Sequence, residues 1–160
     1  MRHIKSEWKI KDIELLGDAI ALGDTQEFEK QLRRYLKESL SYFDNREAFY
    51  HGWMMGILVS LNSNYLCLSN REAGEGRSDI TLTPRFGFRL PGLVMELKHG
   101  ENAQQLDNLA LQALQQIRDK HYVDAFPPEV EEVRCYGIAF CGKECVVKQE
   151  TRDHRANRNA

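Results

Sequence analysis

The 160-residue sequence predicts an α/β domain in which helices flank a mixed central sheet. The first observation is a change of period: apolar residues recur at helical spacing in the first third of the chain and in strand-like runs after residue 64. The second is a strand–helix–strand order over residues 93–141, which predicts two parallel strands joined by a helical crossover. A chain of this length is expected to form one domain with its own core.

Two helices are predicted within residues 7–43. Gly23 is a plausible end for the first, since glycine readily adopts the left-handed backbone that often follows a helix. Asp24 followed by Glu27 resembles a capping box and predicts the start of the second helix. The stripes expected to face the core are Ile10, Ile13, Leu16 and Ile20 in the first helix, and Phe28, Leu32, Tyr35 and Leu36 in the second.

A third helix is expected to begin at Asp44 or Asn45. Its predicted buried stripe repeats every four residues: Phe49, Trp53, Ile57 and Leu61. After it, β-type runs separated by turn-rich segments indicate a hairpin followed by a central strand. The expected strands are 65–72, 78–83 and 93–98.

A strong helix is predicted at 102–122, and the pair Pro127-Pro128 separates it from the last two strands, expected at 134–141 and 144–149. The remaining residues carry almost no apolar side chains, so we expect them to be disordered. The predicted organisation is a helical lead-in at 1–43 packed on the core, a core at 44–149 and a disordered tail at 150–160.

Composition limits the functional classes. The formal net charge of −2 argues against a generally basic nucleic-acid coat, so any nucleic-acid contact must be local. No apolar run approaches the ~20 residues of a membrane span, and the first residues lack the apolar centre of a signal peptide. The four cysteines favour reduced thiols over disulfides, and we expect a cytoplasmic protein with no membrane partner. The oligomeric state cannot be read from the sequence.

Two acids and a lysine suggest a catalytic metal site. Glu96 and Lys98 alternate along one predicted strand and therefore share a face, and Asp79 leads the neighbouring strand. Carboxylates suit a hard cation such as Mg²⁺, and the Leu97 backbone carbonyl would add a third oxygen. Lys98 would hold the attacking water and offset phosphate charge. This set predicts phosphodiester hydrolysis with Mg²⁺, for which Mn²⁺ can substitute.

Several ordered motifs carry a resemblance to a known family: FYHG (49–52), SNREAGEGRSDI (69–80), VMELK (94–98), ALQQI (113–117), KHY (120–122) and YGIAFCGK (136–143). The chain is similar to the PD-(D/E)XK nuclease superfamily, specifically to the bacterial branch often found behind an AAA-ATPase-like domain. The resemblance implies a restriction-endonuclease-like αβββαβ core with extra N-terminal helices. It also implies DNA as the substrate and an ATPase-type domain or partner in the full-length context.

The resemblance implies a role for each matching residue. Asp79 and Glu96 correspond to the metal-binding acids, Lys98 to the catalytic lysine and Gln116 to a glutamine that faces the site. Other residues implied at or near the site are Glu47 or His51 as a further metal ligand, Glu72 as a catalytic acid, and Arg71, Arg77 and Arg85 as phosphate contacts. Ser78 stands where the family often has proline.

Structural explanations compete with these roles. Asp79 alone is a common turn former, and Glu47 can close a capping box with Asp44. Glu72 can simply pair with a neighbouring arginine, and a histidine such as His51 is usually a surface or satisfied side chain. The acids, the lysine and the family resemblance taken together make a metal-dependent nuclease acting on DNA the leading prediction. The alternative is a catalytically silent nuclease-fold module that binds nucleic acid or a protein partner.

Overall fold

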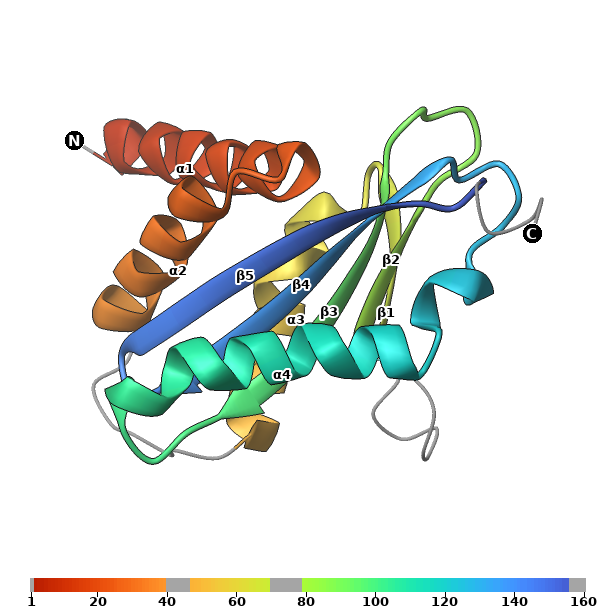
Figure 1. The fold of residues 1–160 in the computed structure, drawn as a ribbon. Helices are drawn as coiled ribbons and strands as arrows, with labels where there is room; N and C mark the ends of the chain where they lie inside the picture. Colours follow the sequence, from red (N-terminus) through yellow and green to blue (C-terminus); the bar gives the residue numbers. More distant parts are fainter. Residues whose placement is uncertain (1, 40–46, 70–78, 156–160) are drawn as a thin grey trace.

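A five-stranded mixed sheet forms the middle layer of the fold, in the spatial order β1-β2-β3-β4-β5 (Figure 1). The computed structural model describes residues 2–39, 47–69 and 79–155, and within these ranges the side chains other than those of 2–11, 39 and 47. The helices are α1 (Arg2–Leu22), α2 (Thr25–Ser39), α3 (Glu47–Leu58) and α4 (Leu106–Asp119). The strands are β1 (Tyr65–Ser69), β2 (Ile80–Pro84), β3 (Gly92–His99), β4 (Glu132–Cys141) and β5 (Glu144–Asp153).

The strand pairing confirms the predicted hairpin and crossover. β1 and β2 are antiparallel with Ser69 opposite Ile80, and β2 and β3 are antiparallel with Ile80 opposite Met95. β3 and β4 are parallel and are connected through α4, and β5 returns antiparallel to β4. The architecture is thus the mixed α/β fold that the sequence predicts.

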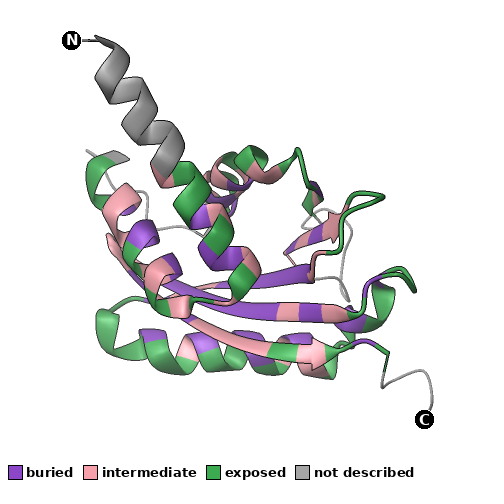
Figure 2. Ribbon diagram, turned by 90° about the horizontal axis from the view of Figure 1, so that it is seen from above, coloured by how far each residue is buried: buried purple, intermediate pink, exposed green. Residues whose placement is uncertain are grey.

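The two faces of the sheet are covered by different helices (Figure 2). Alternation along β3 sends Leu93, Met95 and Leu97 into the core shared with the N-terminal helices. The opposite face of β3 carries Val94 into a second core with the end of α4. Glu96 and Lys98 therefore point to the α4 side of the sheet.

The N-terminal helices belong to the main core. Their buried side chains in that core are Leu16, Ala19, Ile20, Phe28, Leu32 and Leu36. Gly23 has φ of +77° at the end of α1, and the Glu27 N–H donates to the Asp24 carboxylate at 3.0 Å, as the predicted cap requires. Ile13 is 39% exposed, so the predicted stripe of α1 reaches the core only from Leu16 onward, and Ile10 lies outside the described side chains.

The predicted buried stripe of α3 was wrong by one residue. Tyr50, Met54 and Leu58 are buried, and the expected stripe only flanks the core. Both sets repeat every four residues, so periodicity could not choose between them. Contacts with β4 and the turn after it decide which stripe is buried. The Tyr50 ring stacks on Phe140 at 4.5 Å, and its hydroxyl donates to the Gly142 carbonyl at 2.9 Å.

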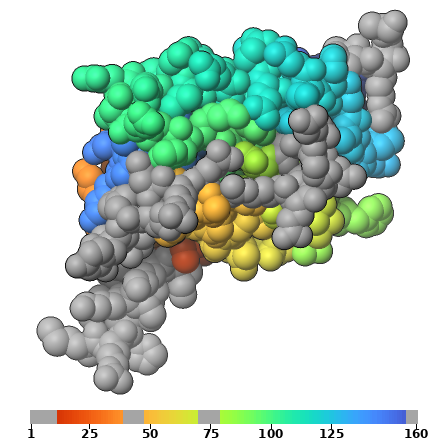
Figure 3. All heavy atoms as spheres, turned by 90° about the horizontal axis from the view of Figure 1, so that it is seen from below, coloured from red at the N-terminus to blue at the C-terminus, as the bar shows by residue number. Residues whose placement is uncertain are grey.

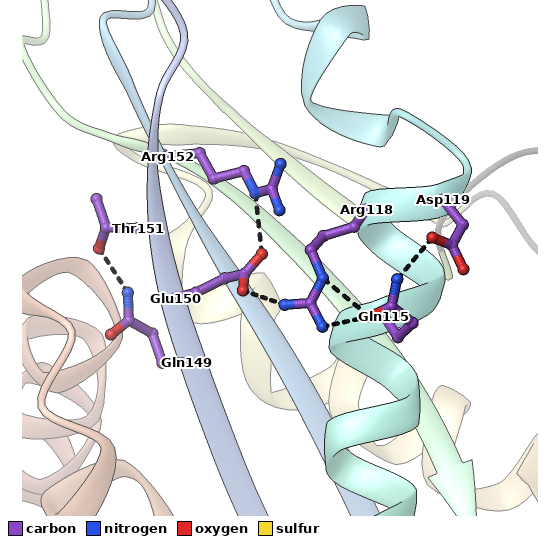
Figure 4. A network of polar contacts seen from close by, with 7 residues as sticks. All are labelled: Gln115, Arg118, Asp119, Gln149, Glu150, Thr151 and Arg152. Atoms are coloured by element: carbon purple, nitrogen blue, oxygen red, sulfur yellow. Dashed lines mark hydrogen bonds and ion pairs between the residues drawn. The ribbon is translucent and has the colours of Figure 1, made fainter.

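The predicted disorder of 150–160 was wrong for its first residues. β5 continues to Asp153, since backbone pairing with β4 does not need apolar side chains. Glu150 accepts from Arg118 of α4 at 2.5 Å and from Arg152 at 2.9 Å, and Figure 4 shows Arg118 between Glu150 and Gln115. His154 beyond the strand is buried, with Nδ1 2.8 Å from the Val130 carbonyl. Residues 156–160 lie outside the description.

Within the described ranges, no helix combines the length and apolar character that a membrane crossing needs.

Candidate active site

Two carboxylates meet where β2 begins and β3 nears its end. Because Ile80 pairs with Met95 in an antiparallel ladder, the next step along both strands places Asp79 opposite Glu96. The Asp79 N–H donates to Glu96 Oε2 at 3.3 Å. The structure therefore brings together the two acids that the sequence predicts as metal ligands.

Asp79 also holds the backbone of β3. Its Oδ2 accepts from the Leu97 N–H at 2.8 Å. The N–H and C=O of one residue in a strand point to the same side, so the Leu97 carbonyl is directed toward the Asp79 side of β3 and away from β4. This orientation suits the predicted role of that carbonyl as a third oxygen donor.

Gln116 of α4 joins the acid to the lysine. Its Oε1 accepts from Lys98 Nζ at 2.6 Å, and its Nε2 donates to Glu96 Oε1 at 2.5 Å. Lys98 Nζ also lies 3.6 Å from Glu96 Oε1. Only one orientation of the amide satisfies both bonds, because a cation must face oxygen and a carboxylate must face N–H. The amide therefore fixes Lys98 and Glu96 relative to each other.

A glycine in β4 allows α4 to lie this close. Gly137 is the β4 partner of Glu96. A Cβ atom at Gly137 would lie 2.1 Å from the backbone oxygen of Ala110 in α4. Only glycine permits that approach of helix to sheet. The position of Gln116 over the two charged residues depends on it.

The surroundings of Glu96 favour its protonated form. The side chain is 4% exposed. Burial, followed by the nearby charge of Asp79, raises the Glu96 pKa to about 7, against the opposing effects of Lys98 and the Asp79 N–H. Asp79 and Glu96 thus lie side by side with the Lys98 ammonium group 3.6 Å from Glu96, and a bound cation would relieve the remaining repulsion between the two carboxylates.

We predict a pH-dependent cost of ionising Glu96 in protein kept in EDTA. The folded-state pKa is raised, so its contribution to stability is complete below pH 4.5 and is lost as pH rises through about 7. Between pH 4.5 and 8, the free energy of unfolding of the wild type should fall by on the order of 3 kcal/mol relative to that of Glu96→Gln. Urea unfolding across this range measures it; parallel curves for the two proteins would contradict the prediction. Saturating Mg²⁺ should reduce the loss.

Tyr122 is a residue of the site that sequence reasoning did not assign. It is buried beside the acids, and burial raises its pKa, a hydrogen bond with Gln116 lowers it, and the charges of Glu96 and Asp79 raise it further. His121 has φ of +54° just after α4, and this left-handed turn sends Tyr122 back toward the site. The motif KHY, whose Tyr122 lies six residues after Gln116, was the available signal.

His51 is placed near the site but is held by another side chain. Its Nε2 lies 3.2 Å from the Ser69 hydroxyl, at the end of β1 that pairs with Ile80. His51 is buried in α3, on the face of the sheet opposite to α4. Glu47 is the first residue of α3, and its side chain lies outside the description.

The remaining predicted residues are three that the structure does not describe and one that it places elsewhere. Arg71, Glu72 and Arg77 lie outside the described residues. Arg85 is at the opposite end of β2 from Asp79, and its Nε donates to the Asn62 carbonyl at 2.6 Å. The structure therefore does not bring Arg85 to this site, because its guanidinium group is bonded to the turn at Asn62.

The donors fit a hard divalent cation. Asp79, Glu96 and the Leu97 carbonyl offer only oxygen, which Mg²⁺ and similar ions prefer. Among the residues that the structure describes, no three His, Cys, Asp or Glu side chains gather at one point. Two carboxylates with a backbone carbonyl leave room for water, as Mg²⁺ commonly requires.

Comparison with known proteins agrees with this geometry. The model of the PD-(D/E)XK nuclease superfamily matches residues 45–150, which include β1 to β4, α4 and the greater part of β5. The comparison with curated proteins gave no match. The matched segment contains Asp79, Glu96, Lys98 and Gln116 in the arrangement described above. This chain belongs to the PD-(D/E)XK nuclease superfamily.

Proposed function

We propose that this protein is a metal-dependent nuclease that hydrolyses phosphodiester bonds in DNA. The observation that carries the proposal is the pairing of Asp79 with Glu96 beside a lysine held by Gln116. Nucleases of this superfamily generally use divalent metal ions. We propose Mg²⁺ as the ion, with Mn²⁺ able to replace it, because all the donors are oxygens. The preference for DNA rests on the family resemblance.

Asp79 and Glu96 would hold the ion together with the Leu97 carbonyl. A bound divalent cation neutralises phosphate charge and lowers the pKa of a water molecule. Asp79 is positioned for this by its bond to the Leu97 N–H, and Glu96 by its bond to Gln116. Both ligands are therefore fixed before the ion binds, which limits the rearrangement needed on binding.

Lys98 would act on the water and the phosphate. Its ammonium group lies on the same face as Glu96 and is anchored by Gln116 at 2.6 Å. From there it can orient the attacking water by hydrogen bonding and stabilise the negative charge that grows on the phosphate oxygens. Gln116 is a positioning residue in this scheme, since its side chain hydrogen-bonds Lys98, Glu96 and Tyr122.

Metal binding and cleavage test the proposal separately. Calorimetry should show Mn²⁺ and Mg²⁺ binding to the wild type, weakened at least about tenfold in Asp79→Asn because one charged ligand is lost. Linear, circular and single-stranded DNA should then be cleaved only with metal. Metal and DNA binding without cleavage of any of the three would support the silent binding module instead, and no metal binding would contradict the site.

The cellular setting is also proposed. Four free thiols, at Cys67, Cys135, Cys141 and Cys145, agree with a reducing compartment such as the cytoplasm. The family resemblance further suggests an ATPase-type domain or partner acting with this nuclease. His51 or Glu47 as a further metal ligand, Glu72 as a catalytic acid, and Arg71 and Arg77 as phosphate contacts remain proposals on the same basis.

A further inference from the structure

A recess lies directly beside the candidate active site. It has a volume of about 650 Å³ and is bounded by the end of β3, by the residues that follow it and by the first half of α4. His99 and Gly100, which line it, follow Lys98 in the chain. Figure 3 views the molecule from this end, with α4 running across it from green to cyan and α3 in yellow on the other side. The recess therefore begins at the residue that follows Lys98 in the chain.

One wall of the recess is a row of carboxamides. Gln104, Asn108 and Gln112, here called the carboxamide row, are spaced four residues apart. Asn108 and Gln112 lie one turn apart on α4, and Gln104 lies in the 3-10 helix (Ala103–Gln105) that leads into it. The next position in the row is Gln116 of the active site. All three side chains of the row are exposed. Within the part of the chain that the structure describes, none of these side chains hydrogen-bonds another residue. The row thus presents unused donors and acceptors to whatever enters the recess.

The charge of the side chains that line the recess does not favour binding of a phosphate group. Among the described residues that line it, Glu101 carries the only carboxylate, and none carries an ammonium or guanidinium group. The electrostatic part of phosphate binding comes from lysine and arginine, whereas carboxamides and carboxylates can also hydrogen-bond the edges of bases. The chemistry of the lining therefore matches bases better than the phosphate backbone.

We propose that this recess receives unpaired bases of the strand that continues from the scissile phosphate, and that Asn108 and Gln112 read their edges. The inference rests on the proposed nuclease function and adds to it a preference among bases. A duplex is read by a convex helix that enters its groove, but a concave recess accepts a base that has left the stack. Because Asn and Gln pair best with adenine through two hydrogen bonds, adenine is the expected preferred base.

Binding without turnover tests the recess. In a Lys98→Ala background with Mg²⁺, fluorescence anisotropy would measure the Kd for short labelled single strands that contain adenine or only pyrimidines. Asn108→Ala and Gln112→Ala should each weaken binding of the adenine-containing strand by roughly 5- to 20-fold, and that of the pyrimidine strand less. The slope of log Kd against log salt should not change, since no phosphate contact is removed.

Gln115→Ala is the matched control. It removes a carboxamide from the same helix, but Gln115 bonds Arg118 and Asp119 on the β5 side (Figure 4). Equal Kd values for Gln115→Ala and the two row variants would overturn the proposal, as would a salt slope reduced by about one, an equal loss with duplex DNA, or no binding of any single strand by the parent. If the wild type fails to cleave DNA but the row variants bind as expected, the nuclease function fails and the recess stands.

Discussion

Lys98→Ala should lower the rate of metal-dependent DNA cleavage by roughly 10²- to 10⁴-fold while the protein stays folded. Lys98 places its ammonium group 3.6 Å from Glu96, and Gln116 holds it in place. Without it, the attacking water loses a hydrogen-bond partner and the charge growing on the phosphate loses a cation. Single-turnover cleavage of a linear duplex with saturating Mn²⁺ would measure the loss directly.

Lys148→Ala is the matched control for this experiment. Lys148 lies on β5 and forms an ion pair with Asp107 of α4 at 2.7 Å, so it is a lysine at the same sheet–helix interface but outside the site. Its replacement should leave the single-turnover rate within about twofold of the wild type. Thermal unfolding should show both variants folded at the assay temperature. Cleavage by Lys98→Ala at the wild-type rate would remove Lys98 from the mechanism.

Gly137→Ala should destabilise the protein by about 2–3 kcal/mol and impair the site as well. The new Cβ atom would lie 2.1 Å from the Ala110 backbone oxygen, a distance that no ordinary contact reaches. Backbone cannot rotate away as a side chain can, so α4 must retreat by about 1 Å. Gln116 moves with the helix and no longer holds Lys98 and Glu96 in place, and a misplacement of this size can cost on the order of 10²-fold in rate.

Gly56→Ala separates this effect from the general consequences of replacing glycine. Gly56 lies in α3, and a Cβ atom there would meet nothing within 4 Å. Alanine favours helix over glycine by about 0.8–1 kcal/mol, so this variant should be neutral or slightly more stable. Urea unfolding and single-turnover cleavage below the transition would be measured for both. A Gly137→Ala protein with wild-type stability would contradict the close helix–sheet contact.

Gly137 connects the fold with the proposed site. It has no functional side chain, but it sets the position of Gln116, which contacts Glu96 and Lys98. It lies opposite Glu96 in the ladder and beneath α4. Its motif, YGIAFCGK, is part of the family resemblance, but the sequence alone assigned it no role. The structural reason is the distance between helix and sheet.

Much of the fold could be predicted because it depends on local patterns. The alternation along 93–98 predicted that Glu96 and Lys98 share a face, and the strand–helix–strand order predicted the parallel pair. Asp24 and Gly23 predicted the break between the first two helices. Each of these signals lies within a few residues, where backbone preference and side-chain spacing decide the outcome.

Other features required contacts between distant segments. Two four-residue stripes competed in α3, and stacking of Tyr50 on Phe140, ninety residues away, decided between them. The strand after residue 149 looked too polar to be ordered, but pairing with β4 and the Arg118–Glu150 contact keep it in the sheet. Local composition cannot report a partner that is far away in the chain.

The sequence by itself therefore predicted the residues proposed for the chemistry, Asp79, Glu96 and Lys98, and the alternation of the strands predicted the face on which Glu96 and Lys98 lie. Only the tertiary structure decided how they work together. It placed the two acids opposite each other, buried Glu96 so that its pKa rises to about 7, and brought Gln116 across from α4 to tie the acid to the lysine. Burial and helix approach are properties of the packed chain, which no local run of residues encodes.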